Sequence, residues 1–166
     1  METAKKILLV DDDIDVVAVV ETILNNEGYI VITACNQEEG LEKAKAEKPD
    51  LAIVDVMMTT EYEGFELAET FLKSGEFKGM PVMMQTSIEI FESTDDDVMK
   101  FARYYRQNMV GKEMDVLLFQ DYETKKSGID YKDAQGKNHW LYVDGFIRKP
   151  VSANTLISSI QRVLNN

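Results

Sequence analysis

One short run, Leu51 to Asp55, joins four consecutive apolar residues to a single carboxylate. A continuous apolar run of this length, followed by turn-forming residues, is typical of a strand buried on both faces, as in a parallel sheet. Because open α/β sheets bind ligands at the carboxyl ends of their strands, Asp55 is a candidate reactive group. An Asp at a strand end is also common simply because a turn follows, so Asp55 alone does not distinguish a reactive group from a turn residue.

Four further segments predict strands, and helical apolar spacing lies between most of them. The predicted strands are Ile7 to Val10, Tyr29 to Thr33 nearer the sheet edge, Pro81 to Met84, and Gly145 to Ile147. Four helices are predicted. The first carries Val17, Val20 and Leu24, and the second runs from a cap at Asn36 to about Glu47. The third carries Phe65, Ala68 and Leu72, and the fourth follows a cap at Ser152. This alternation predicts βαβ units, hence a doubly wound parallel sheet of five strands with helices on both faces.

Composition places the chain among soluble globular proteins. Its 166 residues suffice for one domain, residues 1–166, with 45% apolar and 29% charged residues. The net charge of −12 disfavours a nucleic-acid partner, which would require a basic face. The single cysteine, Cys35, excludes an internal disulfide and suits a reducing compartment. With neither a signal peptide nor an apolar run of membrane length, we expect a cytoplasmic protein without a membrane partner.

The regular alternation breaks after Ser87. Residues from Thr94 predict a helix with Val98, Ala102, Tyr105 and Met109 at helical spacing. The segment 111–142 fits no single element, and we interpret it as an insertion before the fifth strand. Within it, Val116 to Phe119 has the composition of a strand, and two short runs flank Asp133 to Lys137 as in a hairpin.

The strand ends bring together residue types suited to phosphoryl transfer. Asp11, Asp12 and Asp55 are predicted to share one sheet edge, where mutual repulsion raises their pKa values and a Mg²⁺ ion relieves it. Asp55 is the candidate nucleophile, forming an acyl phosphate while the ion neutralises charge on the phosphoryl group. Lys149 is expected to pair with the phosphate, and the Thr86 hydroxyl to donate to a phosphoryl oxygen.

Four motifs in order resemble those of the response-regulator receiver domain of two-component signalling. The resemblance covers roughly residues 5 to 93 and 143 to 164, and it is carried by Leu9 to Asp13, Val54 to Met58, Pro81 to Ser87 and Gly145 to Pro150. It implies a flavodoxin-like sheet of strand order 2-1-3-4-5. It also implies that a histidine kinase or phosphotransfer protein phosphorylates Asp55 and that the domain dephosphorylates itself slowly.

The resemblance also assigns individual roles. Mg²⁺ would be bound by Asp11, Asp12, Asp55 and the backbone carbonyl of Met57. Phe146 falls on the family's aromatic switch position, which turns inward as Thr86 moves toward the phosphate. The Lys149–Pro150 peptide would be cis. All of these assignments are carried over from the family by motif.

Two departures from the family pattern lie close to the signalling machinery. Thr59 stands where the family usually has Pro, and Glu61 to Glu63 lengthen the loop that leads to Gly64. The segment between Ser87 and Phe146 is longer than usual by roughly 40 residues, well beyond an ordinary connection. The family signals onward from this region.

Three functions compete. The first is a phosphoryl switch that is not an ordinary enzyme and, since no output domain follows Asn166, is expected to act through an output protein partner. The second is a receiver-like scaffold that works without phosphorylation. The third is a phosphatase of the haloacid dehalogenase type, whose DxDxV opening Asp13 to Val17 fits, although no further acidic ligand follows Lys149.

Overall fold

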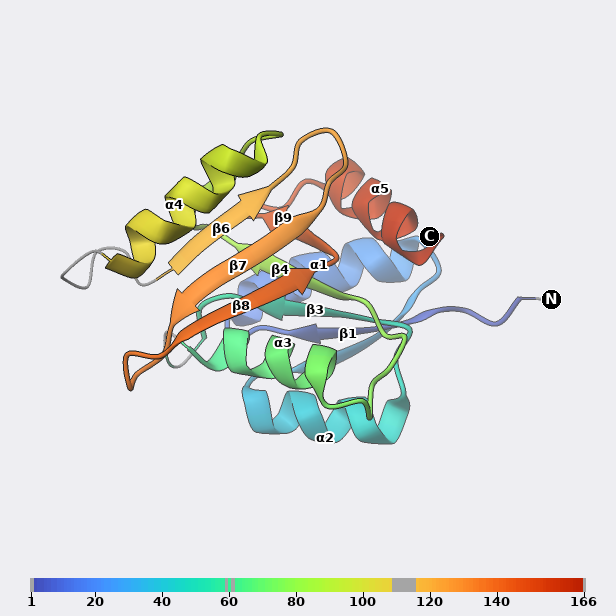
Figure 1. Cartoon of the computed structure of the whole chain (residues 1–166). Helices are drawn as coiled ribbons and strands as arrows, with labels where there is room; N and C mark the ends of the chain where they lie inside the picture. The colour runs from blue at the N-terminus through green and yellow to red at the C-terminus, as the bar shows by residue number, and fades with distance from the viewer. Residues whose placement is uncertain (1, 59, 61, 109–115, 166) are drawn as a thin grey trace. The chain divides into compact units, whose positions relative to one another are not determined.

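The chain folds into two compact units that are joined at two points of the backbone. Met1–Ser87 and Phe146–Asn166 together make the first unit, and Ile88–Gly145 makes the second. The predicted inserted segment, 111–142, lies within the second unit, and its status as an insertion stays a prediction. Figure 1 shows the computed structural model, which describes residues 2–58, 60, 62–108 and 116–165.

The first unit is built on a five-stranded parallel sheet of order β2-β1-β3-β4-β9. Its strands are β1 (Lys6–Val10), β2 (Ile30–Ala34), β3 (Leu51–Asp55), β4 (Val82–Thr86) and β9 (Gly145–Arg148). Since β9 is the fifth strand of this sheet, the predicted order 2-1-3-4-5 and the flavodoxin-like fold class are confirmed. The β-branched segment, β2, lies at the edge as expected.

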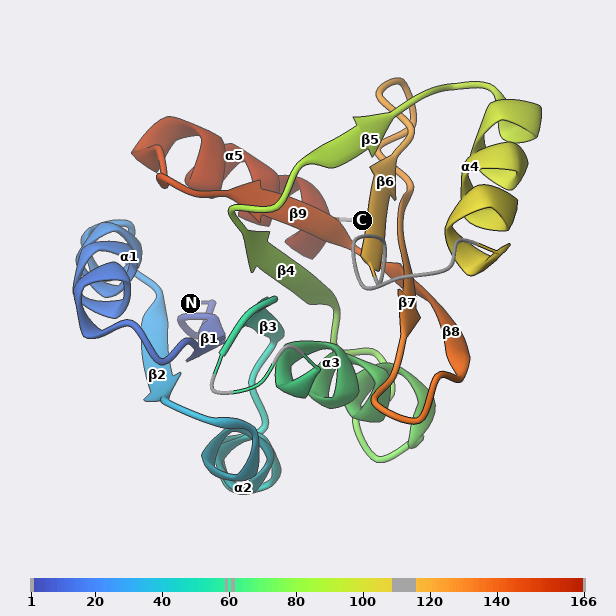
Figure 2. The ribbon, with the colours of Figure 1, turned by 90° about the vertical axis from the view of Figure 1, so that its left-hand side faces the viewer.

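Helices cover both faces of this sheet because its central strands are apolar on both sides. All five residues of β3 and of β4 are buried. Figure 2 shows α1 (Ile14–Asn26) and α5 (Ala153–Leu164) on one face, with α2 (Gln37–Glu47) and α3 (Glu63–Lys73) on the other. Each fully buried Leu or Ile side chain contributes about 1.5–3 kcal/mol to this packing. Among the described residues, no helix is both long and apolar enough to cross a membrane.

The helix ends agree with the sequence in part. The Asn36 side chain accepts a hydrogen bond from the Glu39 N–H at 2.8 Å, so the predicted cap of α2 is present. Ser152 occupies the N-cap position of α5, but its side chain makes no capping hydrogen bond. The sequence therefore predicted the N-cap position of α5 correctly, but the predicted capping hydrogen bond of Ser152 is absent. The buried stripe of α5 stabilises the helix by packing, and a helix held in this way does not depend on its cap.

The second unit contains a four-stranded sheet of order β5-β6-β7-β8 and one helix, α4 (Asp96–Asn108). Its strands are β5 (Ile90–Glu92), β6 (Val116–Gln120), β7 (Ser127–Lys132) and β8 (Asn138–Val143). The predicted helix, the strand and the hairpin are all present, with residues 133–137 joining β7 to β8. Strand β5 was not predicted, because three residues are too short to show a period. Met109 and residues 111–115 lie outside the described residues.

Helix α4 packs its polar side against the sheet. Arg106 and Asp130 are both fully buried and form an ion pair. Arg103 Nε adds a contact of 2.7 Å to the same carboxylate. Two of the apolar residues that predicted the helix, Val98 and Tyr105, are exposed instead, and Ala102 is half-buried. This arrangement reverses the usual amphipathic helix, whose apolar stripe faces the core.

Gly64, in the first turn of α3, marks a close approach of two backbone segments. A Cβ atom at this position would overlap the Asp55 carbonyl oxygen and lie 2.8 Å from that of Val56. At Gly40, in the first turn of α2, a Cβ atom would meet only the side chains of Leu67 and Val10, at 3.1 Å.

Gly64→Ala is therefore predicted to lower the free energy of unfolding by about 1–3 kcal/mol more than Gly40→Ala does. Backbone atoms at Gly64 cannot move aside as side chains at Gly40 can. Urea unfolding of the two variants and the parent protein measures the difference. Equal unfolding free energies for the two variants would contradict the assigned close approach.

Candidate functional site

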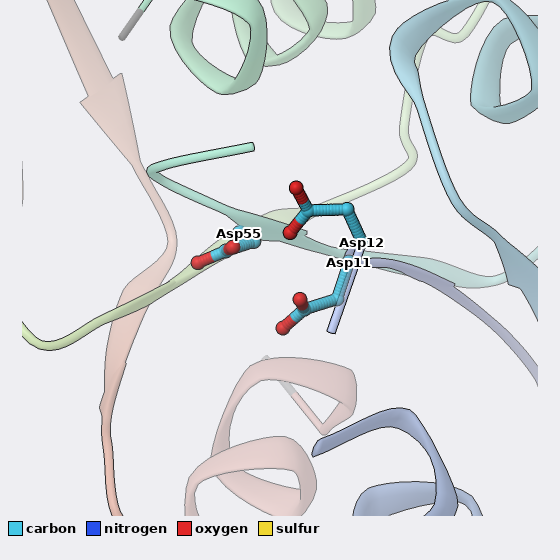
Figure 3. A group of neighbouring side chains, drawn as sticks. All are labelled: Asp11, Asp12 and Asp55. Carbon is cyan, nitrogen blue, oxygen red and sulfur yellow. The ribbon is translucent and has the colours of Figure 1, made fainter. Parts of the chain in front are cut away.

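Three carboxylates meet at the carboxyl edge of the first unit's sheet. One oxygen from each of Asp11, Asp12 and Asp55 lies within 4.8 Å of the other two. Figure 3 shows Asp11 and Asp12 next to each other after β1, with Asp55 at the end of the adjacent strand β3. Asp11 and Asp55 are buried, whereas Asp12 is exposed. The sequence prediction that these acids share one edge is met by the geometry.

Lys149 brings an ammonium group to the two buried acids. Its Nζ lies 3.0 Å from Asp55 Oδ1 and 3.1 Å from Asp11 Oδ2. The Lys149 N–H donates to the Thr86 carbonyl at 2.8 Å, which fixes the backbone after β9 beside the end of β4. The Lys149–Pro150 peptide is cis, as expected from the resemblance. An amine far away in sequence thus bridges the ends of two neighbouring strands.

Asp11 has two further hydrogen-bond donors, and the sequence reading missed both. The Asp13 N–H donates to Oδ1 at 2.8 Å, and Gln85 Nε2 donates to Oδ2 at 2.9 Å. Gln85 is a polar residue that follows the apolar residues Val82 to Met84 in strand β4, and this position was the available signal. With Lys149 included, the Asp11 carboxylate is held by three donors from three parts of the chain.

The electrostatics of Asp55 reflect its burial. Burial is the largest cause that raises its pKa from 3.8 to about 6, and the charge of Asp11 raises it further. Lys149 lowers the pKa of Asp55 through its hydrogen bond and its charge, and the hydrogen bond from the Met57 N–H lowers it as well. Repulsion among the carboxylates, which the sequence predicted, contributes to the raised pKa, but loss of hydration on burial contributes more.

Lys149 carries the complementary shift. Burial alone would lower its pKa, yet hydrogen bonds and charges from Asp55 and Asp11 outweigh burial and raise it. Lys149 therefore stays an ammonium group at neutral pH, the form that pairs with anionic oxygens.

The donor set fits a magnesium ion. Three carboxylates against one ammonium leave excess negative charge at the edge, and carboxylate oxygens are the ligands that Mg²⁺ prefers. The exposed Asp12 leaves one side open to water, and Mg²⁺ usually retains several waters. The Met57 N–H serves Asp55, while the role of the Met57 carbonyl as a metal ligand stays a prediction.

The remaining predicted residues lie at element ends. Thr86, the last residue of β4, and Phe146, in β9, are both buried, and their switching roles stay predictions. Asp13 is the N-cap of α1, where its side chain accepts hydrogen bonds from the Asp15 and Val16 N–H groups. Because Asp13 is committed to helix capping, the structure gives the phosphatase alternative no support.

The molecule is a doubly wound α/β protein with a cluster of acids and one lysine at the carboxyl ends of its strands, the edge at which such sheets usually bind ligands. The model of the response regulator receiver domain family matches residues 7–121. The chain therefore belongs to the response regulator receiver family.

Part of the chain is similar in sequence to proteins named as transcriptional regulators. PhoP, the alkaline phosphatase synthesis transcriptional regulatory protein of Bacillus subtilis, is 40% identical over 83 residues, 50% of this chain and 33% of PhoP. The ycf27 protein of Guillardia theta, named as a probable transcriptional regulator, is 34% identical over 88 residues, 53% of this chain and 33% of its own length. The chain thus matches about a third of each relative. Their names lend no support to the expectation that nucleic acid is not a partner.

Solved structures agree on the fold. The chemotaxis response regulator CheY4 of Vibrio cholerae superposes with a TM-score of 0.60 at 25% identity, covering 97% of this chain and 99% of CheY4. A CheY-like receiver domain protein of Methanospirillum hungatei gives a TM-score of 0.58 at 25% identity, covering 98% and 95%.

The raised pKa of Asp55 predicts a pH-dependent cost to folding in the absence of divalent cations. The folded state binds the Asp55 proton more tightly than the unfolded chain, so stability falls as pH rises from about 4 to about 7. Relative to Asp55→Asn, the parent protein should lose about 1–3 kcal/mol over this range.

Urea unfolding in EDTA across this pH range measures the loss. The exposed acid Asp15, replaced by Asn, is the control and should follow the parent profile. A gap between the parent and Asp55→Asn that is independent of pH would contradict the buried, protonatable Asp55.

Proposed function

We propose that Asp55 accepts a phosphoryl group from a phosphohistidine on a histidine kinase or phosphotransfer protein. A carboxylate oxygen of Asp55 forms the new bond to phosphorus while the bond from phosphorus to the imidazole nitrogen breaks. The leaving imidazole takes up a proton, and the product is an acyl phosphate. The observation that carries this proposal is the Lys149 ammonium group within 3.1 Å of both buried carboxylates.

Each residue of the edge has a task in this proposal. Lys149 pairs with a phosphoryl oxygen, and the Thr86 hydroxyl donates to another. Asp11, Asp12 and Asp55, with the Met57 carbonyl, would hold Mg²⁺, which neutralises charge on the phosphoryl oxygens when bound. Water later hydrolyses the acyl phosphate slowly, so the domain resets itself without acting as an enzyme on a separate substrate.

We assign the output of the switch to the second unit, Ile88–Gly145. This unit begins two residues after Thr86 and ends directly before Phe146, the two proposed switch residues. A phosphorylation-linked movement at these two residues would therefore occur next to both junctions of the unit. Its helix α4 presents Phe101 and Tyr104, exposed at 69% and 65%, as a surface for a protein partner.

Phosphorylation is tested by incubating the chain with Mg²⁺ and acetyl phosphate and measuring its intact mass. A gain of one phosphoryl group is expected for the parent protein and for Asp15→Asn, and none for Asp55→Ala. If the parent protein shows neither a gain nor binding of beryllofluoride, the chain is a scaffold that works without phosphate.

The proposed output predicts a change in the second unit when the site is loaded. With Mg²⁺ and beryllofluoride, amide hydrogen exchange should change in peptides that contain Ile88 to Ile90 and Val143 to Gly145. Asp55→Asn, which lacks the acceptor charge, should show no such change. Protection confined to Asp11 to Asp13 and Asp55 to Met58 would contradict the assigned output.

A further inference from the structure

Gln85 occupies an unusual place for a polar side chain. It is fully buried in β4, where its backbone is paired in register with Asp55. Its Nε2 donates to Asp11 Oδ2 at 2.9 Å. Its Oε1 is buried and has no hydrogen-bond partner among the residues that the structure describes. A buried amide with one end unsatisfied costs stability compared with an apolar side chain.

The orientation of the amide is set by Asp11. An ionised carboxylate only accepts hydrogen bonds, so the nitrogen of Gln85 must face Asp11 and the oxygen must turn away. The unsatisfied oxygen is thus the consequence of one contact, the bond to Asp11. That contact joins the end of β4 to the end of β1 across the intervening strand β3.

The two side-chain donors to Asp11 Oδ2 differ in what else they contact. Lys149 divides its ammonium group between Asp11 and Asp55. Gln85 is neutral and has Asp11 as the partner of its amide nitrogen. If Lys149 turns toward a phosphoryl group on Asp55, as proposed above, Gln85 still holds the Asp11 oxygen.

We infer that Gln85 is a positioning residue that orients Asp11 for a divalent cation independently of Lys149. Asp11 then stays oriented for the cation when the Lys149 ammonium group leaves Asp11 and pairs with a phosphoryl oxygen. The exchange rests on the proposed function, whereas the orientation of Asp11 is measurable by cation binding alone. Hydrogen-bond partners of metal-binding side chains commonly contribute 10- to 100-fold to metal affinity.

The test compares Gln85→Leu with Met84→Leu. Met84 is the preceding residue of β4, equally buried, with its side chain on the opposite face, and both variants place Leu in the same strand. Isothermal titration with Mg²⁺ should show a Kd about tenfold higher for Gln85→Leu. Met84→Leu should bind like the parent protein. Cooperative thermal unfolding in EDTA checks that both variants fold.

A second readout separates positioning from a direct role on phosphate. In labelling by acetyl phosphate, the half-saturating Mg²⁺ concentration of Gln85→Leu should rise about tenfold. At saturating Mg²⁺, its labelling rate should return to that of the parent protein. Thr86→Ala, which removes a proposed phosphate contact, should instead stay slow at saturating Mg²⁺.

Several results would overturn the inference. They are an unchanged Mg²⁺ Kd in Gln85→Leu, an equal shift in Met84→Leu, a labelling rate that stays low at saturating Mg²⁺, or a parent protein that binds no Mg²⁺. A parent protein that binds Mg²⁺ but takes up no phosphoryl group would refute the proposed function. In that case the Mg²⁺ titration still decides the role of Gln85.

Discussion

The site depends on two buried carboxylates that share one ammonium group. Burying a charge is costly unless it is paired, and here the Lys149 ammonium group has to serve both Asp11 and Asp55. Burial and the charge of Asp11 raise the pKa of Asp55 even though Lys149 pairs with it. The folded protein therefore holds an excess of negative charge at one sheet edge, which a divalent cation would neutralise if it bound there as proposed.

The parallel sheet makes this concentration of charge possible. Adjacent parallel strands place their carboxyl ends side by side, so residues distant in sequence meet without a special loop. Lys149 and Asp55 are 94 positions apart in sequence. They meet because β9, which precedes Lys149, and β3, which ends in Asp55, lie on either side of β4 in the sheet. The second unit interrupts the chain between β4 and β9 and leaves this geometry intact. The close approach at Gly64 anchors α3 against the backbone at the end of β3.

Local patterns in the sequence predicted the parts that depend on local physics. Apolar runs ending in Asp11 and Asp55, with helical spacing between them, predicted the strands and the acidic edge, whereas the strand order came from the resemblance to the receiver family. Contacts across the sheet have no such pattern, so Gln85 was missed although it lies one position before Thr86. The dominant effect on Asp55 was missed for a related reason, since burial depends on the packed structure. Ser152 makes no capping hydrogen bond, and the buried residues of α5 supply packing that a cap pattern in the sequence does not report.

The second unit shows where sequence periodicity misleads. The apolar spacing in α4 identified a helix correctly, yet its sheet-facing side carries the charge of Arg106 against buried Asp130. The aromatic side is exposed, and Phe101 stacks on Tyr105 with ring centroids 6.4 Å apart. Exposed aromatic side chains are costly in water and become favourable when a partner covers them. An outward aromatic stripe, on a unit whose two junctions adjoin Thr86 and Phe146, therefore suits the proposed output through a protein partner.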